Sequence, residues 1–300
     1  MNFEKIASIA QRYQENTSAY FGFAFKDLNT GKVIDHHGDE AFPTASSYKL
    51  FILAELFRKV HAGECSLLDR IPLTEEVKSE GSGVLQCLGA GLNPTLKDYA
   101  TLMMIISDNT ATDVLFNFLG RDNIKKNVID ALGLEKTKCD WGCKDLLDHY
   151  YSMNGRTFAE IWAENGNKRP SYRNVEWYKC ITEENDQTAP LEAMKMLELV
   201  YRGEWVSKEA SEGMIAIMKE CQTNSRIPRH LPIGVDVAHK TGTLDRLNAD
   251  IGIVYTAKGD YILCLFYNGN LANEEDYAAN AGDDYLAALS KEIYEAYMEE

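Results

Sequence analysis

The stretch that decides the fold is Ser46-Ser47-Tyr48-Lys49-Leu50-Phe51-Ile52-Leu53. Apolar side chains dominate positions 48 to 60 and lie almost all round a helix, which predicts a buried helix over 46–60. Ser46 and Lys49 are three residues apart, so the first turn of this helix places both side chains on one face, beside unpaired backbone N–H groups. The stretch therefore predicts a core helix with two polar side chains at its tip.

Ser46 and Lys49 have the chemistry of an activated nucleophile. A serine hydroxyl reacts slowly at neutral pH unless an adjacent base takes its proton, and a lysine desolvated in a cleft can become that base. The alternative is an N-capping serine followed by a solvated lysine, because Ser-x-x-Lys is expected about once by chance in a chain of this length.

Ser107-Asp108-Asn109 is a second polar cluster, and it lies between two stretches with helical periodicity. This position projects side chains from a helical lobe into a cleft, where Ser107 can relay a proton and Asn109 can hold both a lysine and a substrate amide. A helix-capping cluster is the alternative interpretation.

Lys240-Thr241-Gly242-Thr243 is a third cluster, on a stretch with the pattern of a strand. The charge of Lys240 suits a substrate carboxylate, and Gly242 lets a substrate approach the strand backbone. The backbone N–H of Thr243 can complete an oxyanion hole with that of Ser46. The alternative is an edge strand that carries a protective lysine.

Strand patterns come from both ends of the chain and helical patterns from its middle. Strands are expected over 19–26, 32–35, 235–241, 250–256 and 261–268, beside helices at 2–15 and around 285–293. Further helices are expected over 46–60, 96–106, 110–119, 191–201 and 208–221. These patterns predict an α+β fold, in which a five-stranded antiparallel sheet flanked by the terminal helices carries an inserted all-α lobe. We expect residues 1–45 and 226–300 to form the sheet domain and residues 46–225 the helical domain.

The composition excludes several classes of protein. The chain has 31 Lys and Arg against 46 Asp and Glu, a formal charge of −15, which repels nucleic acid and anionic membrane surfaces. No apolar run reaches the roughly 18 residues of a membrane span, and the first residues lack a signal-peptide core. Seven scattered cysteines favour a reducing compartment, so we expect a cytoplasmic protein, or an exported one if the chain is a trimmed mature form. Cys139-x-x-x-Cys143 has no second pair at zinc spacing, so we expect no metal and no cofactor.

The three clusters together are far rarer than each alone, since a given tripeptide is expected roughly 0.04 times in such a chain. Their order and settings resemble the penicillin-recognising serine enzymes, and above all the class A β-lactamases. The resemblance extends over nearly the whole chain and implies a β-lactamase/transpeptidase-like fold. The matching residues are implied to act as nucleophile (Ser46), base (Lys49), proton relay (Ser107), substrate ligands (Asn109, Lys240 and Thr241) and second oxyanion donor (Thr243).

One feature of the family is missing from the chain. Class A enzymes carry Arg-x-Glu-x-x-Leu-Asn in an omega loop, where the Glu activates the water that releases the acyl group, and no such string occurs here. Glu176 is the nearest replacement for this base. Asp186 matches the acidic residue that closes the base of the loop.

The segment between Ser107 and Pro190 is roughly thirty residues longer than the family pattern implies. Its residues 139–187 are rich in aromatic side chains, which are expected to wall the cleft, or else to form a small satellite core or a subunit contact. Arg246, shortly after the third cluster, is expected to assist Lys240 with a substrate carboxylate, or to serve only as a turn residue.

The resemblance implies acyl transfer through an ester at Ser46, and hydrolysis of β-lactams or similar cyclic amides is the first hypothesis. The same motifs also serve a D-alanyl peptidase or a small-ester hydrolase. A hypothesis of another class is a β-lactam-binding module that is acylated without turnover. In each case the expected partner is a small molecule, and the oligomeric state stays open.

Overall fold

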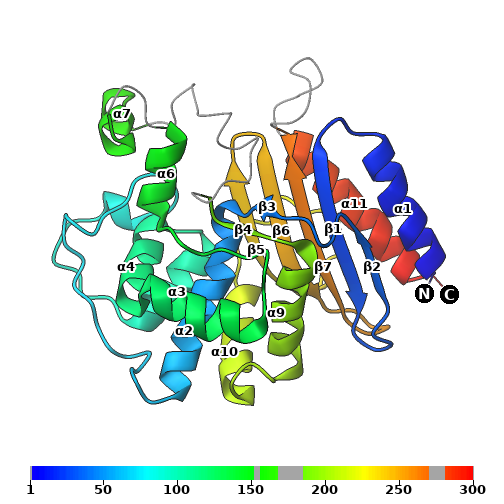
Figure 1. Ribbon diagram of the computed structural model, residues 1–300, viewed down its shortest axis with the longest axis horizontal. Coiled ribbons are helices and arrows are strands. Elements are labelled where there is room, and N and C mark those ends of the chain that lie inside the picture. Colours follow the sequence, from blue (N-terminus) through cyan, green and yellow to red (C-terminus); the bar gives the residue numbers. More distant parts are fainter. Residues whose placement is uncertain (1, 152–155, 168–184, 270–280, 300) are drawn as a thin grey trace.

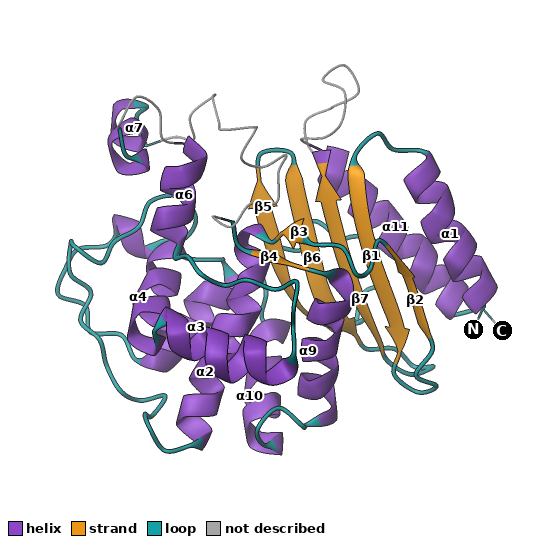
Figure 2. Cartoon of the chain, in the orientation of Figure 1, coloured by secondary structure: helices purple, strands orange, loops and turns teal. Residues whose placement is uncertain are grey.

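The computed structural model describes residues 2–151, 156–167, 185–269 and 281–299 of the chain. In this part of the chain, a five-stranded antiparallel sheet stands beside a lobe of helices (Figures 1 and 2). The strands are β1 (Tyr20–Asp27), β2 (Val33–His36), β5 (Val237–Leu244), β6 (Leu247–Val254) and β7 (Tyr261–Asn268). Their order in the sheet is β2-β1-β7-β6-β5. The predicted α+β fold is therefore confirmed.

Strand β1 joins the two ends of the chain in one sheet. It pairs antiparallel with β2 on one side and, along its whole length, with β7 on the other. Phe21, Phe23 and Phe25 belong to the core beneath the terminal helices, whereas Ala24 belongs to the core shared with the helical lobe. Because side chains alternate along a strand, a strand covered on both faces needs this apolar character at every position.

The terminal helices α1 (Phe3–Glu15) and α11 (Ala281–Tyr297) lie side by side on the outer face of the sheet, so the two chain ends are adjacent (Figure 1). Asn2 caps α1, because its side chain accepts a hydrogen bond from the backbone N–H of Lys5 at 3.0 Å. Aliphatic side chains of both helices cover the phenylalanines of β1; these are Ile6, Ile9, Leu286, Leu289 and Ile293.

Helix α2 (Lys49–His61) is the centre of the helical lobe, and every side chain from 49 to 57 is buried. The helices around it are α3 (Leu96–Ile105), α4 (Asn109–Leu119), α5 (Arg121–Ile124), α6 (Cys143–Tyr151), α7 (Phe158–Glu164), α9 (Pro190–Arg202) and α10 (Lys208–Lys219), with a 3-10 turn at Leu85–Cys87 and a π-helical turn at Lys125–Asp130. Helices α9 and α10 pack on the inner face of the sheet. A short sheet of β3 (Phe42–Pro43) and β4 (Gln187–Thr188) ties the segment before α2 to the segment before α9.

The core helix starts differently from the prediction. Residues Ala45–Tyr48 form a 3-10 turn, and the α-helix begins only at Lys49. The apolar pattern is continuous across both segments, so it does not reveal the change. One buried cluster includes α2 and the inner face of the sheet. The division into a sheet domain of 1–45 with 226–300 and a helical domain of 46–225 stays a prediction.

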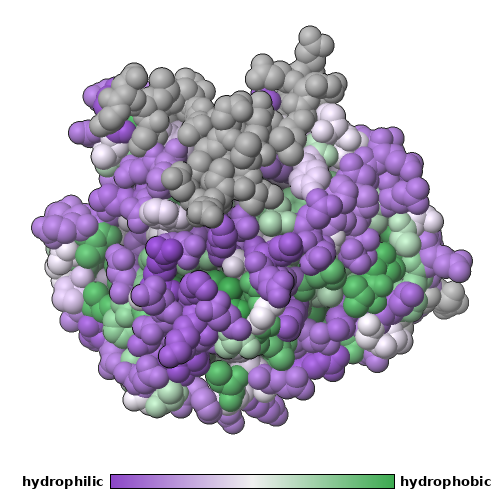
Figure 3. All heavy atoms as spheres, in the orientation of Figure 1, coloured by the Kyte–Doolittle hydropathy of each residue, from purple (hydrophilic) through white to green (hydrophobic). Residues whose placement is uncertain are grey.

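The face of the molecule in Figure 3 is mostly hydrophilic with small apolar patches, which suits a chain with a formal charge of −15. No helix in the part of the chain that the structure describes is long and apolar enough to cross a membrane.

Candidate active site

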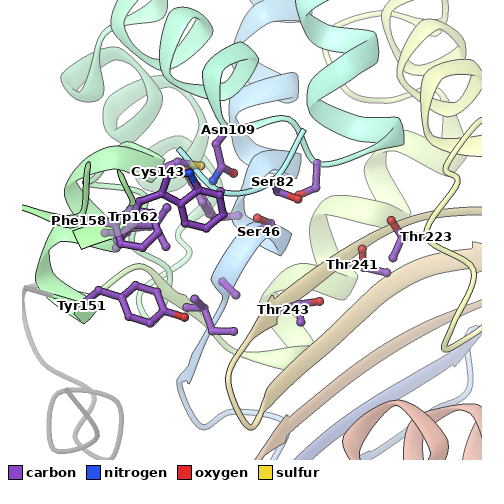
Figure 4. Close-up of a pocket in the computed structure, with 17 residues that line it drawn as sticks. Ser46, Ser82, Asn109, Cys143, Tyr151, Phe158, Trp162, Thr223, Thr241 and Thr243 are labelled. Atoms are coloured by element: carbon purple, nitrogen blue, oxygen red, sulfur yellow. The ribbon is translucent and has the colours of Figure 1, made fainter. Parts of the chain in front are cut away.

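A pocket of about 310 Å³ lies between the edge strand β5 and the helical lobe. Figure 4 shows Ser46 in this pocket between two groups of polar side chains. Ser82 and Asn109 come from the helical lobe, and Thr241 and Thr243 come from β5. The three clusters that the sequence singles out therefore meet at one place, although they are far apart along the chain.

Hydrogen bonds fix the turn that carries Ser46. Thr44 donates from its backbone N–H and its Oγ1 to the carbonyl oxygen of Asp186, at 3.0 and 3.1 Å. The Thr44 carbonyl oxygen accepts from the backbone N–H and the hydroxyl of Ser47, at 3.1 and 2.8 Å. Ala45 has a φ of 44°, a left-handed conformation that is uncommon for a residue with a side chain. Together these constraints hold Ser46 half-buried in the pocket.

Gly242 lets strand β5 touch this turn. A Cβ atom at position 242 would overlap the carbonyl oxygen of Thr44 and lie 3.2 Å from the backbone nitrogen of Ser46. The sequence led us to expect that this glycine makes room for a substrate. The structure instead gives its space to the turn, which brings the backbone N–H of Ser46 next to β5.

Ser107 Oγ links the two lysines of the site. It accepts a hydrogen bond from Lys49 Nζ and another from Lys240 Nζ, each at 3.1 Å. Lys49 Nζ also donates to the carbonyl oxygen of Ser107 at 2.9 Å and to Asn109 Oδ1 at 3.1 Å. Among the described residues, no hydrogen bond joins Lys49 Nζ to Ser46 Oγ. The predicted base is thus directed at Ser107 and Asn109 in this structure.

The hydroxyl of Ser107 still has its own hydrogen to donate. A serine hydroxyl has one O–H and two lone pairs, and the two lysines occupy both lone pairs. Its proton can therefore point into the pocket, which Ser107 lines. Ser107 itself has a φ of 59°, an uncommon conformation for a serine that the neighbouring structure must support.

In the second cluster, helix capping and cleft lining fall to different residues. Asp108 caps α4 by accepting from the backbone N–H of Ala111 at 2.9 Å, and it also accepts from the backbone of Val84 and Leu85. Asn109 faces the pocket, where its Nδ2 donates to the carbonyl oxygen of Glu80 at 2.9 Å. One amide hydrogen of Asn109 therefore stays available for a substrate carbonyl group.

Lys240 lies behind the pocket wall. Its side chain is fully buried, and its Nζ donates to the carbonyl oxygen of Thr241 at 2.6 Å besides Ser107. Burial, together with the charge of Lys49, lowers the pKa of Lys240 to about 7. Thr241 and Ser107, which Lys240 contacts, therefore lie between its charge and the pocket. With a pKa of about 7, this charge changes with pH around neutrality.

Arg226 is a residue of this site that the sequence did not reveal. Its guanidinium is buried and donates to the carbonyl oxygens of Gly242 and Ala249, at 2.9 and 2.7 Å, and to Thr243 Oγ1 at 2.5 Å. It also forms an ion pair with Asp283 at 2.7 Å. Arg226 therefore fixes β5 beside the pocket. No local pattern marks such a residue, because its partners are 16 to 57 residues away.

The other predicted residues near β5 occupy distinct places. Thr241 and Thr243 both line the pocket. Arg246 lies in the tight turn between β5 and β6, with a φ of 58°, and the described pocket lining ends before it, at Leu244. His239 is buried on the other face of the strand, where the Asp250 carboxylate at 2.8 Å overcomes the effect of burial and raises the pKa of His239 to about 10.

The aromatic extension forms a wall of the pocket. Its described residues in the lining belong to α6 and α7: Cys143, Leu146, Leu147, Tyr151, Phe158 and Trp162. Figure 4 places Tyr151, Phe158 and Trp162 on the side of Ser46 away from Thr241. Tyr151 and Phe158 also belong to the main core, so these residues of the extension do not form a separate satellite core.

The expected deacylation base, Glu176, lies outside the described residues. Asp186 is buried, which raises the pKa of its carboxyl group well above the usual range, and its Oδ1 accepts from the backbone N–H groups of Asp140 and Trp141 at 2.7 and 3.3 Å. In the described ranges, no group of three or more His, Cys, Asp and Glu side chains is arranged to hold a metal ion.

Comparisons of the sequence and the fold with known proteins identify the family of the chain. The family model of the β-lactamase enzyme family matches residues 3–297. β-Lactamase CARB-4 of Pseudomonas aeruginosa is 26% identical over 138 residues, which are 46% of this chain and about half (48%) of that relative. β-Lactamase BRO-1 of Moraxella catarrhalis is 20% identical over 97% of this chain and 83% of its own length. A crystal structure of a β-lactamase from Sphaerobacter thermophilus DSM 20745 superposes with a TM-score of 0.79 and 25% identity, over 99% of this chain and 98% of that one. The chain therefore belongs to the β-lactamase enzyme family.

Proposed function

We propose that this protein is a serine hydrolase that opens cyclic amides through an ester at Ser46, with β-lactams as its substrate class. The observation that carries the proposal is the position of Ser107 Oγ, 3.1 Å from both Lys49 Nζ and Lys240 Nζ, in a pocket that Ser46 also lines. This arrangement places a nucleophile in the same pocket as a chain of groups that can move a proton. Membership of the family supports the reaction class.

The proposed reaction begins when Ser46 Oγ attacks the carbonyl carbon of the amide. Backbone N–H groups of Ser46 and Thr243 stabilise the oxyanion that forms. The C–N bond then breaks, and the serine proton travels through Lys49 and Ser107 to the leaving nitrogen. Water finally hydrolyses the ester, which releases the acid and restores the Ser46 hydroxyl.

One observation favours a second candidate in which the acyl group leaves slowly. No Asp, Glu or His is among the described residues that line the pocket, so this part of the wall offers no carboxylate to activate water. The second candidate is acylation without turnover of β-lactams. It applies either to a β-lactam-binding module or to an enzyme whose substrates are D-alanyl peptides or small esters.

Intact-protein mass spectrometry with benzylpenicillin tests the nucleophile. We expect one penicilloyl adduct on the wild type and none on Ser46→Ala. Ser82→Ala is the matched control, because it removes another exposed pocket hydroxyl, and we expect it to keep the adduct. An adduct that persists on Ser46→Ala would refute the assignment.

A chromogenic cephalosporin separates the two candidates. Many turnovers per protein molecule support β-lactam hydrolysis, whereas one stoichiometric burst supports acylation without turnover. Absence of reaction with the cephalosporin, together with turnover of a D-alanyl peptide or a small ester, would move the substrate class to those compounds.

A further inference from the structure

A second group of reactive side chains surrounds the ring of His239, which lies on the face of β5 opposite Lys240. The group consists of Cys221, just after the end of α10, His239 itself and Asp250 of β6. His239 and Asp250 are 1% and 0% exposed, and Cys221 is 6% exposed. A thiol, an imidazole and a carboxylate in this order are the parts of an activated cysteine nucleophile. The proposed reaction at Ser46 uses none of them.

The contacts of the His239 ring hold it as an imidazolium. Its Nδ1 is 2.8 Å from Asp250 Oδ1, and its Nε2 is 3.2 Å from the amide oxygen of Asn224. Both partners are acceptors, so both ring nitrogens donate, and only the protonated ring has two N–H groups. Burial alone would lower the pKa of His239, but the charge of Asp250 raises it to about 10. Asp250 is fixed in turn, because its Oδ2 accepts from the backbone N–H of Ile227 at 3.0 Å.

The thiol of Cys221 is held by groups that favour its thiolate form. It makes a hydrogen bond with the His239 ring and accepts another from the backbone N–H of Thr223. Burial opposes the charged form, but these hydrogen bonds and the positive charges of His239 and Lys240 lower the pKa of Cys221. A thiolate paired with an imidazolium is the reactive form of a cysteine.

The other buried thiols of the described chain behave differently. Burial raises the pKa of each of them, and they are Cys139, Cys143 and Cys264. A thiol that stays protonated is a poor nucleophile and reacts slowly with an oxidant. Among the buried cysteines that the structure describes, Cys221 is therefore the one prepared to react.

The position of Cys221 suits a small reagent. Its neighbours along the chain, Glu220 and Gln222, are both exposed, so the group lies close beneath the surface. Thr223, which bonds the sulfur through its backbone, lines the Ser46 pocket (Figure 4). A sulfur with so little exposed surface excludes bulky electrophiles. Hydrogen peroxide is small, and it oxidises thiolates in preference to thiols.

We propose that Cys221 is a modification site at which hydrogen peroxide oxidises the thiolate to a sulfenic acid, while His239 and Asp250 keep the sulfur reactive. The sulfur attacks one peroxide oxygen, so that an S–O bond forms and the O–O bond breaks. The sulfur is oxidised by two electrons, and the peroxide is reduced. The second oxygen departs as hydroxide and becomes water by taking a proton from the imidazolium.

The test measures the loss of each free thiol when the whole protein is exposed to hydrogen peroxide at pH 6 and at pH 8. The peroxide is then removed, the protein is unfolded and alkylated with iodoacetamide, and peptide mass spectrometry gives the fraction of each cysteine that remains free. An ordinary exposed thiol loses more than about fiftyfold of its thiolate between pH 8 and pH 6. We expect the exposed Cys87 to slow by this factor and Cys221 by less than about fivefold.

A variant makes the result specific to the imidazolium. His239→Gln keeps a polar side chain but cannot carry the charge, so the oxidation of Cys221 at pH 6 should slow by at least about tenfold. His230→Gln, which changes an exposed histidine, is the matched control and should leave this rate unchanged. The wild-type pH profile decides the proposal by itself if His239→Gln fails to fold.

Three results would overturn the proposal. They are an equal pH dependence of Cys221 and Cys87, a Cys221 thiol that stays free at both pH values, and an unchanged rate in a folded His239→Gln. No β-lactam takes part in the experiment, so its outcome does not depend on the proposed function of Ser46.

Discussion

The two walls of the pocket are built in different ways. The β5 wall consists of a regular strand whose polar groups are held by buried charges, since Arg226 is bonded to Gly242, Ala249, Thr243 and Asp283. The α6 and α7 wall consists of two short helices whose rings stack on one another. Fixed hydrogen bonds and charges hold the β5 wall, whereas shape and apolar packing hold the α6 and α7 wall. The comparison therefore separates two ways of building one pocket.

The two walls also differ in how they should respond to mutation. A buried charge that loses its partners is costly, while a ring at the exposed end of a stack leaves a solvated gap. The helix α7 has its own support in a capping box, in which Thr157 and Glu160 bond each other's backbone N–H groups. We therefore expect large effects at the β5 wall and small ones at the aromatic wall.

The largest effect is expected at Arg226. Arg226→Met fills a similar volume but removes four hydrogen bonds and leaves Asp283 without its cation, so the free energy of unfolding should fall by about 3–5 kcal/mol. Denaturant unfolding measures this loss. Arg229→Met is the matched control, because Arg229 pairs with Asp284 on the surface and such a pair contributes about 0–1 kcal/mol. Equal losses in both variants would contradict a special role for Arg226.

Gly242→Ala comes next, because it tests the contact between β5 and the Ser46 turn. The added methyl group overlaps the Thr44 carbonyl oxygen, which should lower the free energy of unfolding by about 1–3 kcal/mol. It should also slow acylation at least about tenfold, since a small shift of the nucleophile is costly. Gly89→Ala has nothing within 4 Å of the new methyl group and should leave the acylation rate unchanged. A normal acylation rate in Gly242→Ala would show that the contact does not position Ser46.

Much of the fold could be predicted from the sequence, because periodicity reports local burial. The aromatic, strand-like run in β1 and the apolar run in α2 each identified the right element to within a few residues. The helices α6 and α7 were not predicted, since their aromatic residues follow no clear period and left a cleft wall, a satellite core and a subunit contact open. The 3-10 turn at Ser46 was also missed, because it depends on Thr44 and the distant Asp186.

The candidate site could be predicted in part, because several of its residues belong to short sequence motifs. Ser46, Lys49 and the clusters at 107–109 and 240–243 are short motifs, and the structure brings them together. Their catalytic roles stay predictions. Arg226 could not be found from the sequence, because only the folded chain brings it to Asp283. The burial of Lys240 could not be found either, and the sequence analysis expected this lysine to bind a substrate carboxylate directly.

A third effect at the β5 wall concerns pH and tests whether the charge of Lys240 serves this wall. Its pKa is lowered to about 7, so Lys240 is a cation below pH 7 and neutral above it. The second-order rate constant for acylation reports the free protein, and a penicillin carboxylate stays ionised from pH 6 to 9. The constant should therefore fall as pH rises through 7, by about tenfold per pH unit at most.

Lys240→Arg gives the control, because a guanidinium keeps its charge throughout this range and should abolish the fall. A penicillin methyl ester, which has no carboxylate, should show a weaker fall on the wild type. A flat profile to pH 9 on the wild type would show that acylation does not depend on the charge of Lys240, and the same fall in Lys240→Arg would assign the pH dependence to another group. The β5 wall would then act through its hydrogen bonds and not through the charge of Lys240, and the difference between the two walls would be one of polarity alone.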